Sequence, residues 1–550
     1  MGSRKVKNII IAGLVILVFS GFFPGKEDLY FEITKNIDLF SKVYKEISFN
    51  YVDNVDPELF MRAGIAGMLS SLDPYTIFVD ENKKDEIDLI TNGKYGGIGV
   101  TIGVRGDKIT IVEVLDGYAA QRQGLRVGDV IIEAGGVKLT PENVENMSTL
   151  VKGEPGTSVE LKVVRNEDRD TVKFNVMREE VIVKNIAYYG FYPENSGNAY
   201  IKLTNFSRSA GDELKHALKE LKSKREIESI VLDLRGNPGG LLDVAVDIAN
   251  KFLKKDLLIV TTKGRDPSSV KKYYSVQEPM VGNAKLAVLI NEGTASASEI
   301  VAGAMQDHDR GIIMGTKSFG KGLVQTITPL NFNTSLKITT AKYYTPSGRC
   351  IQKIDYSKRN NIISDVDSIV AGSFLTDNKR VVYSAGGITP DSTVDFDIDG
   401  EITKDLLAKG MFFRFADYYF YNNQKANYPK LNSETLFSDF TKYLEQQKYS
   451  YKSDAEVQVE KLITDVKAKK MEGSLSAELS KIKESFEKLD NSEMKVYKDE
   501  IIREIRAELA LRYLGSEGKI KELLKYDTQF QTALKVLESE KFYSHLLSHK

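Results

Sequence analysis

The sequence predicts a multidomain α/β protein with a helical region at each end and a compact β module ahead of the α/β part. The chain has 550 residues, of which 42% are hydrophobic and 28% charged, and this length exceeds what one hydrophobic core serves. Short β-branched runs separated by glycine turns dominate residues 95–181. Between residues 185 and 397, apolar strand-like runs alternate with helical patterns, which indicates βα units and a largely parallel sheet.

The first residues have the pattern of an export or membrane signal. Arg4, Lys5 and Lys7 precede an uncharged apolar run from Ile9 to Phe23. A helix of that length spans about 22 Å, which is less than the hydrocarbon core of about 30 Å. The run is therefore compatible with two alternatives, a signal peptide and a short membrane anchor. Positive charge ahead of the run places the remainder outside the cytoplasmic membrane. We therefore expect residues 1–29 to be a signal peptide or anchor and the chain to be exported to the cell envelope.

The remaining elements follow in order along the chain. Stretches such as "LFSKVYKEISFNYV" and "LFMRAGIAGMLSSL" space their apolar residues at helical intervals and predict a helical N-terminal region. The strands of the α/β part are expected at "IESIVLDLR", "KLAVLIN" and "GIIMG", and "EIIREIRAELALRYLG" is typical of the helical C-terminal region. The expected boundaries are 30–92 for the N-terminal helices, 93–182 for the β module, 183–399 for the α/β core and 400–550 for the C-terminal helices.

Charge and residue counts exclude several function classes. The formal net charge is −1, so there is no basic excess to neutralise phosphates and we predict no nucleic-acid partner. The one cysteine, Cys350, allows neither an intrachain disulfide nor a Cys-rich zinc site. Among four histidines only His545 and His549 have a metal-like spacing, and they lie at the chain end. We predict no metal and no cofactor.

Two junctions between a strand and a helix can hold an anion. In "VLDLRGNPGGLLDVAV", glycines let the backbone turn tightly and aim N–H groups at a ligand. In "GTASASEIVAGAMQDHDR", Ser296 lies at a helix N-terminus, beside unpaired N–H groups and the positive end of the helix dipole. Side by side, the junctions would form an oxyanion hole for acyl transfer.

Ser296 has two interpretations. With Glu299 three residues later it fits a capping box, in which Glu299 is a capping partner. As a nucleophile it needs a base, and His308 is three turns further along the same predicted helix. Lys321, flanked by glycines in "GTKSFGKGLVQ", is the natural alternative, so we predict a Ser-Lys dyad. Ser298 is expected to be a first-turn helix residue and not a rival nucleophile.

A Ser-Lys dyad requires a lysine whose amine is neutral at the working pH, and therefore a lysine with a lowered pKa. At an unperturbed pKa of about 10.4, only about one lysine in a few thousand is neutral at pH 7, so burial or positive potential must lower the pKa by several units. Phe319, Leu323 and Val324 are apolar neighbours of Lys321, and no carboxylate lies within five positions in the sequence. The local sequence therefore fits desolvation, and Gln325 is placed to orient the amine.

The motifs together resemble a known peptidase family. "DLRGNPGG", "GTASASEI", "GTKSFGKGLVQ" and "YYTPSGRCIQ", followed by "GITPD", are similar in order and spacing to the C-terminal processing (tail-specific) peptidases, which are PDZ-containing serine peptidases. The resemblance implies a crotonase/ClpP-like core of ββα units, with Ser296 as nucleophile, Lys321 as base and Gln325 as third member of the site.

The same resemblance implies the oxyanion donors. These are the N–H of Ala297 and the N–H of Gly239 or Gly240. One departure is visible, because Thr294 stands where many members carry the first serine of the motif. It leaves the implied nucleophile intact.

The β module resembles a PDZ domain through "YGGIGV" and "VEVLDGYAAQRQGLRVGDVIIEAGG". In a PDZ domain the N–H groups of a glycine loop bind a terminal carboxylate and the peptide adds as a strand. The resemblance implies that Gly97, Ile98 and Gly99 form this loop and that Ile98 and Val100 line an apolar pocket. It also makes Arg126 a candidate for passing the signal of ligand capture to the catalytic site.

We therefore expect an exported serine endopeptidase that recognises disordered C-terminal tails of proteins or peptides and cleaves them. One alternative is a non-catalytic PDZ scaffold that binds tails beside a vestigial α/β region. Another is an acyl-CoA-type crotonase relative, which the PDZ-like insertion and the lack of an evident nucleotide site disfavour. The N-terminal segment would contact the membrane if it is uncleaved, and the C-terminal helices would mediate self-association or dock an adaptor.

Overall fold

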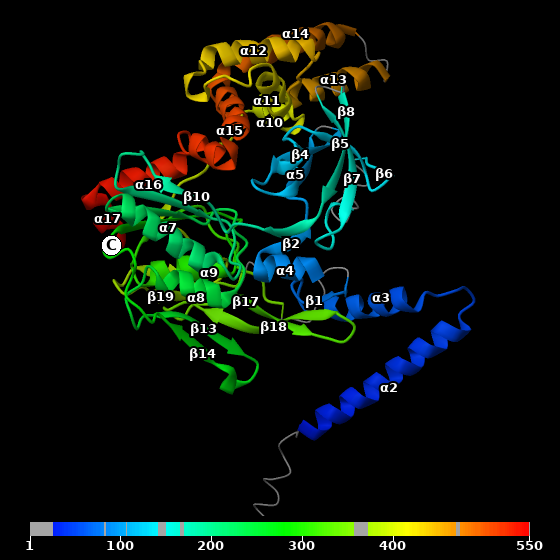
Figure 1. Cartoon of the computed structure of the whole chain (residues 1–550), viewed down its shortest axis with the longest axis vertical. Coiled ribbons are helices and arrows are strands. Elements are labelled where there is room, and N and C mark those ends of the chain that lie inside the picture. The colour runs from blue at the N-terminus through cyan, green and yellow to red at the C-terminus, as the bar shows by residue number, and fades with distance from the viewer. Residues whose placement is uncertain are drawn as a thin grey trace, which may run out of the picture. The chain divides into compact units, whose positions relative to one another are not determined.

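The structure is a computed structural model that describes residues 26–81, 84–105, 107–140, 150–165, 170–356, 372–468 and 473–548 (Figure 1). The expected export signal at residues 9–23 lies outside the described residues. Within the described ranges, none of the helices combines the length and apolar character that spanning a bilayer requires. The chain divides into two compact units, Met1–Phe78 with Tyr356–Asn361, and Val79–Asp355 with Ile362–Lys550.

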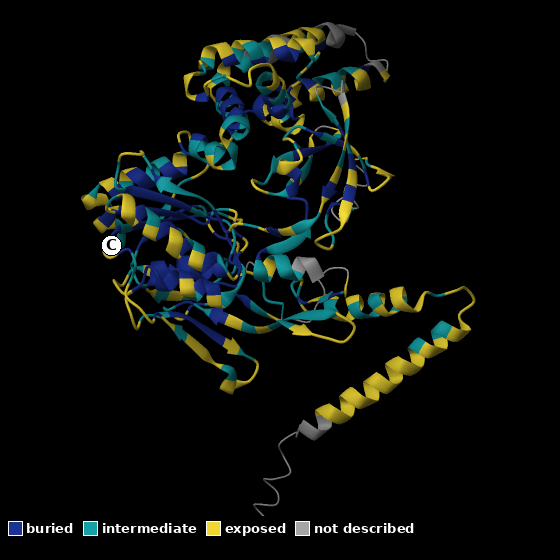
Figure 2. Cartoon of the chain, in the orientation of Figure 1, coloured by how far each residue is buried: buried dark blue, intermediate teal, exposed yellow. Residues whose placement is uncertain are grey.

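The described part of the first unit contains two helices, as the apolar spacing predicts. They are α2 (Lys26–Asn50) and α3 (Pro57–Ser70). Asp56 caps α3 by accepting the backbone N–H groups of Glu58 and Leu59 at 2.9 and 3.1 Å. The ring of Tyr44 stacks on Phe60 with centroids 5.7 Å apart, which holds the two helices together. Most residues along α2 are exposed (Figure 2).

The β module of the second unit is an antiparallel sheet in the order β3-β4-β5-β7-β8, with β6 pairing β5. Its strands are β3 (Val100–Arg105), β4 (Lys108–Val114), β5 (Val130–Ala134), β6 (Val137–Lys138), β7 (Ser158–Arg165) and β8 (Asp170–Met177), with a short helix α5 (Ala119–Arg122). In β7, Val159, Leu161 and Val163 are buried while the residues between them are not. This alternation puts one face of the strand in the core of the module.

A two-stranded ribbon joins the start and end of this module. Helix α4 (Lys84–Asn92) leads into β2 (Lys94–Gly97), which pairs antiparallel with β9 (Glu179–Ile182). The chain therefore enters and leaves the module at the same place.

The α/β core is a sheet in the order β10-β11-β12-β15-β16-β21. Only β10 runs antiparallel to its neighbour, and the other neighbours are parallel, which confirms the predicted βα architecture. The strands are β10 (Ile186–Phe191), β11 (Asn198–Leu203), β12 (Ser229–Asp233), β15 (Lys285–Ile290), β16 (Ile312–Gly315) and β21 (Ser392–Thr393).

Both faces of this sheet are covered. Leu286, Val288 and Ile290 of β15 belong to the core under helices α7 (Ala210–Lys224), α8 (Leu242–Asn250) and α9 (Ala297–Asp307). The alternate residues Ala287 and Leu289 belong to a second core on the opposite face. A strand that is buried on both faces has a continuous run of apolar residues in its sequence, and "KLAVLI" has this pattern.

A second sheet carries the segment after the predicted lysine. Strand β18 pairs antiparallel with β13 and with β17, and β13 also pairs with β14. Besides the strands of the β module and its ribbon, the described strands outside the core sheet are β1 (Ile77–Val79), β13 (Leu258–Gly264), β14 (Lys271–Tyr274), β17 (Leu323–Pro329), β18 (Ser335–Tyr344), and the hairpin of β19 (Ser373–Leu375) with β20 (Val381–Tyr383).

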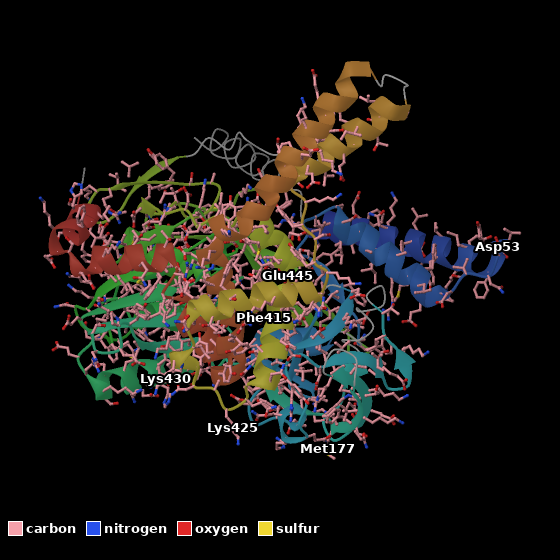
Figure 3. All side chains as sticks on the ribbon, turned by 90° about the horizontal axis from the view of Figure 1, so that it is seen from above. Asp53, Met177, Phe415, Lys425, Lys430 and Glu445 are labelled. Carbon is pink, nitrogen blue, oxygen red and sulfur yellow. The ribbon has the colours of Figure 1, made fainter. Side chains whose placement is uncertain are left out.

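The C-terminal region is helical, as predicted, and much of it has its own core. Phe412 stacks on Phe440 at 5.2 Å, and Phe415, which is labelled in Figure 3, meets the same ring edge-on. The helices are α10 (Glu401–Ala408), α11 (Met411–Asn422), α12 (Ser433–Gln446), α13 (Asp454–Ala468), α14 (Gly473–Val496), α15 (Lys498–Leu523), α16 (Thr528–Glu538) and α17 (Glu540–Leu547).

Helices α16 and α17 have a different role, because they cover the second face of the core sheet. Phe530 of α16 lies edge-on to Tyr200 of β11 at 5.0 Å, within the core that also contains Val231 and Leu289. The N-terminus of α16 is fixed by Arg235, whose guanidinium binds both the Asp233 and the Asp527 carboxylates at 2.6 Å. The end of the chain thus completes the α/β core.

The Arg235 bridge should therefore contribute strongly to stability. Burial raises the pKa of Asp233, but the Arg235 guanidinium outweighs burial and holds the pKa at about 2. Arg235→Gln would leave two carboxylates without their cation, and we expect it to lower the free energy of unfolding by about 3–5 kcal/mol, measured by urea unfolding. Arg265→Gln, at an exposed position, is the control and should change it by less than about 0.5 kcal/mol.

The effect of Arg235→Gln should depend on pH in a defined direction. Because the pKa of Asp233 in the folded state is below its unfolded value of about 3.9, the bridge stabilises the fold fully above about pH 4. This contribution is lost as the pH falls through about 2. A difference between wild type and variant that grows on acidification would contradict this account.

Candidate active site

The carboxyl ends of three adjacent parallel strands place the predicted site residues at one edge of the sheet. The glycine junction follows β12, the Ser296 turn follows β15 and the Lys321 loop follows β16. Carboxyl ends of neighbouring parallel strands meet at the same edge, where ligands bind in open α/β sheets. The three motifs are therefore neighbours in space, although they are spread along the sequence.

Ser296 is the N-cap of α9 and has an unusual backbone conformation, with φ 56° and ψ −115°. A positive φ is strained for a residue with a side chain and is retained where its surroundings enforce it. Thr294 fixes the turn through its hydroxyl, which donates to the Leu234 carbonyl at 2.9 Å. The departure from serine at this position therefore keeps the hydrogen-bonding group.

Asn237 joins the Ser296 turn to the glycine junction. Its backbone carbonyl accepts the Ala295 N–H and the Ser298 hydroxyl, each at 3.0 Å. The interpretation of Ser298 as a structural helix residue is confirmed, because its buried hydroxyl is engaged there. Asn237 was not predicted to have a role, although an asparagine opening a Pro-Gly-Gly turn is a signal for local side-chain hydrogen bonds.

Gly239 lies directly against the Ser296 turn. A Cβ atom at Gly239 would be 2.8 Å from the Ala297 nitrogen and 3.0 Å from the Ser296 Cβ, and its φ is 95°. Only glycine fits there. The Gly239 N–H donates to Asn237 Oδ1 at 2.9 Å, while Gly240, with φ 157°, lies against Phe206. The two implied oxyanion elements, Ala297 and the glycine pair, are thus adjacent.

Glu299 links the serine turn to the lysine loop. Its Oε2 accepts the backbone N–H of Ser296 at 2.8 Å and the backbone N–H of Lys321 at 2.9 Å. Its Oε1 accepts the Ser318 hydroxyl at 2.6 Å and the Gly320 N–H at 2.8 Å. The predicted role as capping partner is confirmed for the Glu299 carboxylate, and its three contacts in the lysine loop were not foreseen.

The carboxylate of Glu299 is fully buried, with 0% exposure. Burial raises its pKa, and the hydrogen bonds from Ser318, Lys321, Gly320 and Ser296 act in the opposite direction. A buried carboxylate is tolerated when its oxygens are hydrogen-bonded. Four donors satisfy this condition, so the arrangement fixes the backbones of Ser296 and Lys321 to a single oxygen atom.

The half-buried Lys321 lies in a loop that two further segments support. Gly320 has φ 87°, and its carbonyl accepts the Lys353 N–H at 2.9 Å. The Gly322 N–H donates to Gln352 Oε1 at 2.7 Å. The motif "YYTPSGRCIQ" therefore supports the backbone of the lysine loop, and "GITPD" lies along it, since the Ile388 N–H donates to the Ser318 hydroxyl at 2.6 Å.

Gln325 follows on β17, two residues into the strand that leaves the lysine loop. Its side-chain amide donates to Thr339 Oγ1 of β18 at 3.3 Å, and the pairing of these strands is irregular between Val324 and Gln325. In this structure the Gln325 amide is thus engaged with β18. Its implied role as third member of the site stays a prediction.

Tyr343 of β18 is a further residue of this site, to which the sequence analysis gave no role. Its hydroxyl donates to the Ser296 carbonyl at 3.2 Å, and its backbone N–H donates to the Gly322 carbonyl at 2.9 Å. The available signal was a pair of tyrosines at the end of the run "SLKITTAKYY", where one of two successive side chains of a strand faces the core.

The predicted peptide loop of the β module has the expected local geometry. Gly99 has φ 82°, and a Cβ atom there would lie 2.4 Å from the Tyr118 Cβ. Ile98 is buried in the module core and its carbonyl accepts the Ala120 N–H at 3.0 Å. Gly97 ends β2 and Val100 begins β3. Peptide binding by these residues stays a prediction.

Arg126 is exposed on the β module, and its backbone N–H donates to Asp129 Oδ2 at 2.9 Å. Its predicted role in passing a signal stays a prediction.

In the described part of the chain, no group of three His, Cys, Asp or Glu side chains could hold a metal ion. Of the histidine pair at the chain end, His549 lies outside the described residues.

Comparisons with protein families match three parts of the chain. Residues 197–366 match the model of peptidase family S41, and residues 110–165 match that of the PDZ domain. Residues 402–537 match a model described as the C-terminal helical domain of a probable PDZ-protease.

The chain is also similar to two curated relatives and to one solved structure. A carboxy-terminal-processing protease of Bartonella bacilliformis is 35% identical over 346 residues, which cover 62% of this chain and 78% of the relative. The carboxy-terminal processing protease CtpB of Bacillus subtilis is 30% identical over 368 residues, covering 64% and 76%. The photosystem II D1 C-terminal processing protease has a TM-score of 0.35 and 23% identity, covering 65% of this chain and 92% of that one.

The hydrogen bonds of Glu299 predict a specific loss on substitution. Glu299→Gln replaces one accepting oxygen by an NH₂ group that would face two donors, so we expect the free energy of unfolding to fall by about 1–3 kcal/mol in denaturant unfolding. Glu292→Gln changes an exposed carboxylate in the same turn and should change it by less than about 0.5 kcal/mol. Equal effects of the two substitutions would refute the bridging role.

Proposed function

The chain belongs to peptidase family S41, and on that premise we propose that this serine peptidase cleaves the C-terminal tails of proteins with a Ser296–Lys321 dyad. The observation that carries the proposal is the Glu299 carboxylate oxygen, which accepts the backbone N–H groups of both residues. This contact brings together the backbones of two residues that lie 25 residues apart in the sequence.

In the proposed mechanism, Ser296 Oγ attacks the scissile carbonyl while the neutral Lys321 amine accepts its proton. The Ala297 N–H, with the N–H of Gly239 or Gly240, would stabilise the negative charge on the carbonyl oxygen. Lys321 would then return the proton to the leaving amine, and water would hydrolyse the acyl-enzyme by the reverse proton transfers. Gln325 would orient the lysine amine.

The strained Ser296 backbone favours catalysis over the scaffold alternative. Strain of this kind costs about 1–3 kcal/mol and is typical of functional sites, whereas a domain that only captures tails gains nothing from it. The match to peptidase family S41 likewise argues against an acyl-CoA-dependent crotonase activity. The proposed reaction uses no metal and no cofactor.

The dyad is tested by incubating the purified full chain with a folded protein that carries a disordered tail. We expect Ser296→Ala, Lys321→Ala and Lys321→Arg each to lower kcat/KM by about 10⁴-fold or more. Removing one member of a catalytic unit costs nearly as much activity as removing the whole unit. Arginine cannot act as the base, since its guanidinium stays protonated. Product masses from intact mass spectrometry give the cleavage sites.

Ser298→Ala is the matched control for the dyad and should retain activity within about threefold, because the hydroxyl that it removes donates to the Asn237 carbonyl. Cleavage by Ser296→Ala at the wild-type rate would exclude the dyad. Tail binding without cleavage by the wild type would favour the scaffold.

We propose that the PDZ domain selects these substrates by their free C-terminal carboxylate, which the backbone N–H groups of Gly97, Ile98 and Gly99 would bind. Support comes from the positive φ of Gly99 and from its lack of space for a side chain against Tyr118. Ile98 and Val100 would line the pocket for the last side chain, and Arg126 would signal occupancy to the catalytic site.

The carboxylate dependence is measured as the Kd of a fluorescent tail peptide for Ser296→Ala, which does not consume it. We expect a C-terminal amide to bind about ten- to a hundredfold more weakly than the acid, the loss expected for a hydrogen-bonded charge. Adding Gly99→Val should weaken the acid similarly, whereas Gly67→Ala, at a position with open space around it, should not. Equal Kd values for acid and amide would exclude carboxylate capture.

We also propose that the protein acts in the cell envelope, because positively charged residues precede the apolar run from Ile9 to Phe23. Its partners would be proteins or peptides with free, disordered C-termini, and the N-terminal segment would contact the membrane if it is uncleaved. Self-association or adaptor binding by the C-terminal helices would fall to α10–α15, since α16 and α17 cover the core sheet.

A further inference from the structure

Tyr343 is a second residue, besides Glu299, that connects the Ser296 turn to the lysine loop. Its side chain is buried, with 1% exposure, in the same core as α9. Its hydroxyl donates to the Ser296 carbonyl at 3.2 Å, and its backbone N–H donates to the carbonyl of Gly322, the residue after Lys321. Glu299 holds the N–H of Ser296, so both polar groups of the Ser296 backbone are tied to the lysine loop.

The Ser296 carbonyl matters because of the peptide unit to which it belongs. In a planar trans peptide the C=O of one residue and the N–H of the next point in opposite directions. The direction of the Ser296 C=O therefore sets the direction of the Ala297 N–H, which is the implied oxyanion donor. Three donors converge on this carbonyl: the N–H groups of Glu299 and Ile300, at 2.9 and 3.0 Å, and the Tyr343 hydroxyl.

The Tyr343 hydroxyl can only donate at this contact. Burial raises the pKa of Tyr343 well above its ordinary value, and the nearby Glu299 carboxylate raises it further. The phenol therefore stays protonated at any pH at which the enzyme works. The N–H groups of Glu299 and Ile300 direct the Ser296 carbonyl along the axis of α9. Of its three hydrogen bonds, only the one from Tyr343 comes from the sheet that carries the lysine loop.

We infer that Tyr343 is a positioning residue that aims the Ala297 N–H at the oxyanion and sets the Ser296 turn in register with Lys321. The role rests on the proposed Ser296–Lys321 function. In the step that it serves, the Ser296 Oγ–carbon bond forms and the carbonyl π pair moves to oxygen. The Oγ proton passes to the Lys321 amine, and the new oxyanion accepts the Ala297 N–H. Tyr343 touches neither the substrate nor the proton in transit.

The test is Tyr343→Phe, which removes the donor and keeps the ring. We expect kcat on a tailed substrate to fall about five- to tenfold with KM unchanged, the size of one neutral hydrogen bond felt only in the transition state. The Kd of the tail peptide, measured in the Ser296→Ala background with and without Tyr343→Phe, should not change. The Ki of a peptide aldehyde, whose hemiacetal oxygen occupies the oxyanion position, should rise by the same factor as kcat falls.

Tyr344→Phe is the matched control, since the adjacent ring lies under the Lys263 ammonium, 4.3 Å from its centroid, on the other face of the strand. It should leave kcat and the aldehyde Ki unchanged. Unchanged kcat in Tyr343→Phe, or a change in KM and peptide Kd with kcat preserved, would overturn the positioning role.

Two further results separate the remaining possibilities. If Tyr343→Phe does not fold, 3-fluorotyrosine is placed at position 343, where the stronger donor should keep kcat at or above the wild-type value. A fall in kcat with that residue would overturn the role. Cleavage that survives Ser296→Ala would remove the proposed function itself, whereas active wild type, inactive Ser296→Ala and fully active Tyr343→Phe would remove only this inference.

Discussion

The architecture of the site depends on one buried carboxylate. Glu299 accepts four hydrogen bonds, two from backbone N–H groups of the lysine loop, one from Ser318 and one from Ser296. An unpaired carboxylate at 0% exposure would destabilise the fold by several kcal/mol, so the loop that carries Lys321 must close over the start of α9 for Glu299 to be tolerated. Folding therefore also brings the backbones of Ser296 and Lys321 together.

The parallel sheet makes this closure possible. Strands β12, β15 and β16 are neighbours, and their carboxyl ends deliver the glycine junction, the Ser296 turn and the lysine loop to one edge. The sheet is rigid because apolar side chains fill both of its faces, with α7–α9 on one side and α16 and α17 on the other. Helix α16 thus supports the sheet that carries the site, through the packing of Phe530 and the bridge from Arg235 to Asp527. Rigid support of this kind lets a strained Ser296 persist.

The sequence was sufficient for β12, β15 and β16 and for helices α8 and α9 of the core, because hydrophobic periodicity and glycine junctions are local signals. It identified Glu299 as a capping partner for the same reason, since Ser296 is three residues away. The bonds from Glu299 to Gly320 and Lys321 could not be read from spacing, because they depend on two strands being neighbours in the sheet. Tyr343 was missed for a related reason, since its role appears only when β18 is placed beside α9. The packing of α16 on the sheet also depends on long-range contacts that amphipathic spacing does not specify.

The most direct test of the account is the site of covalent modification by an alkyl fluorophosphonate, located by tandem mass spectrometry on the intact full chain and on Lys321→Ala. Attack at phosphorus needs an activated serine hydroxyl held beside its base. The account predicts a single modified residue, Ser296, and loss of modification in Lys321→Ala while that variant remains folded. Modification at Ser298 or elsewhere, or equal modification of Ser296 without the lysine, would contradict it.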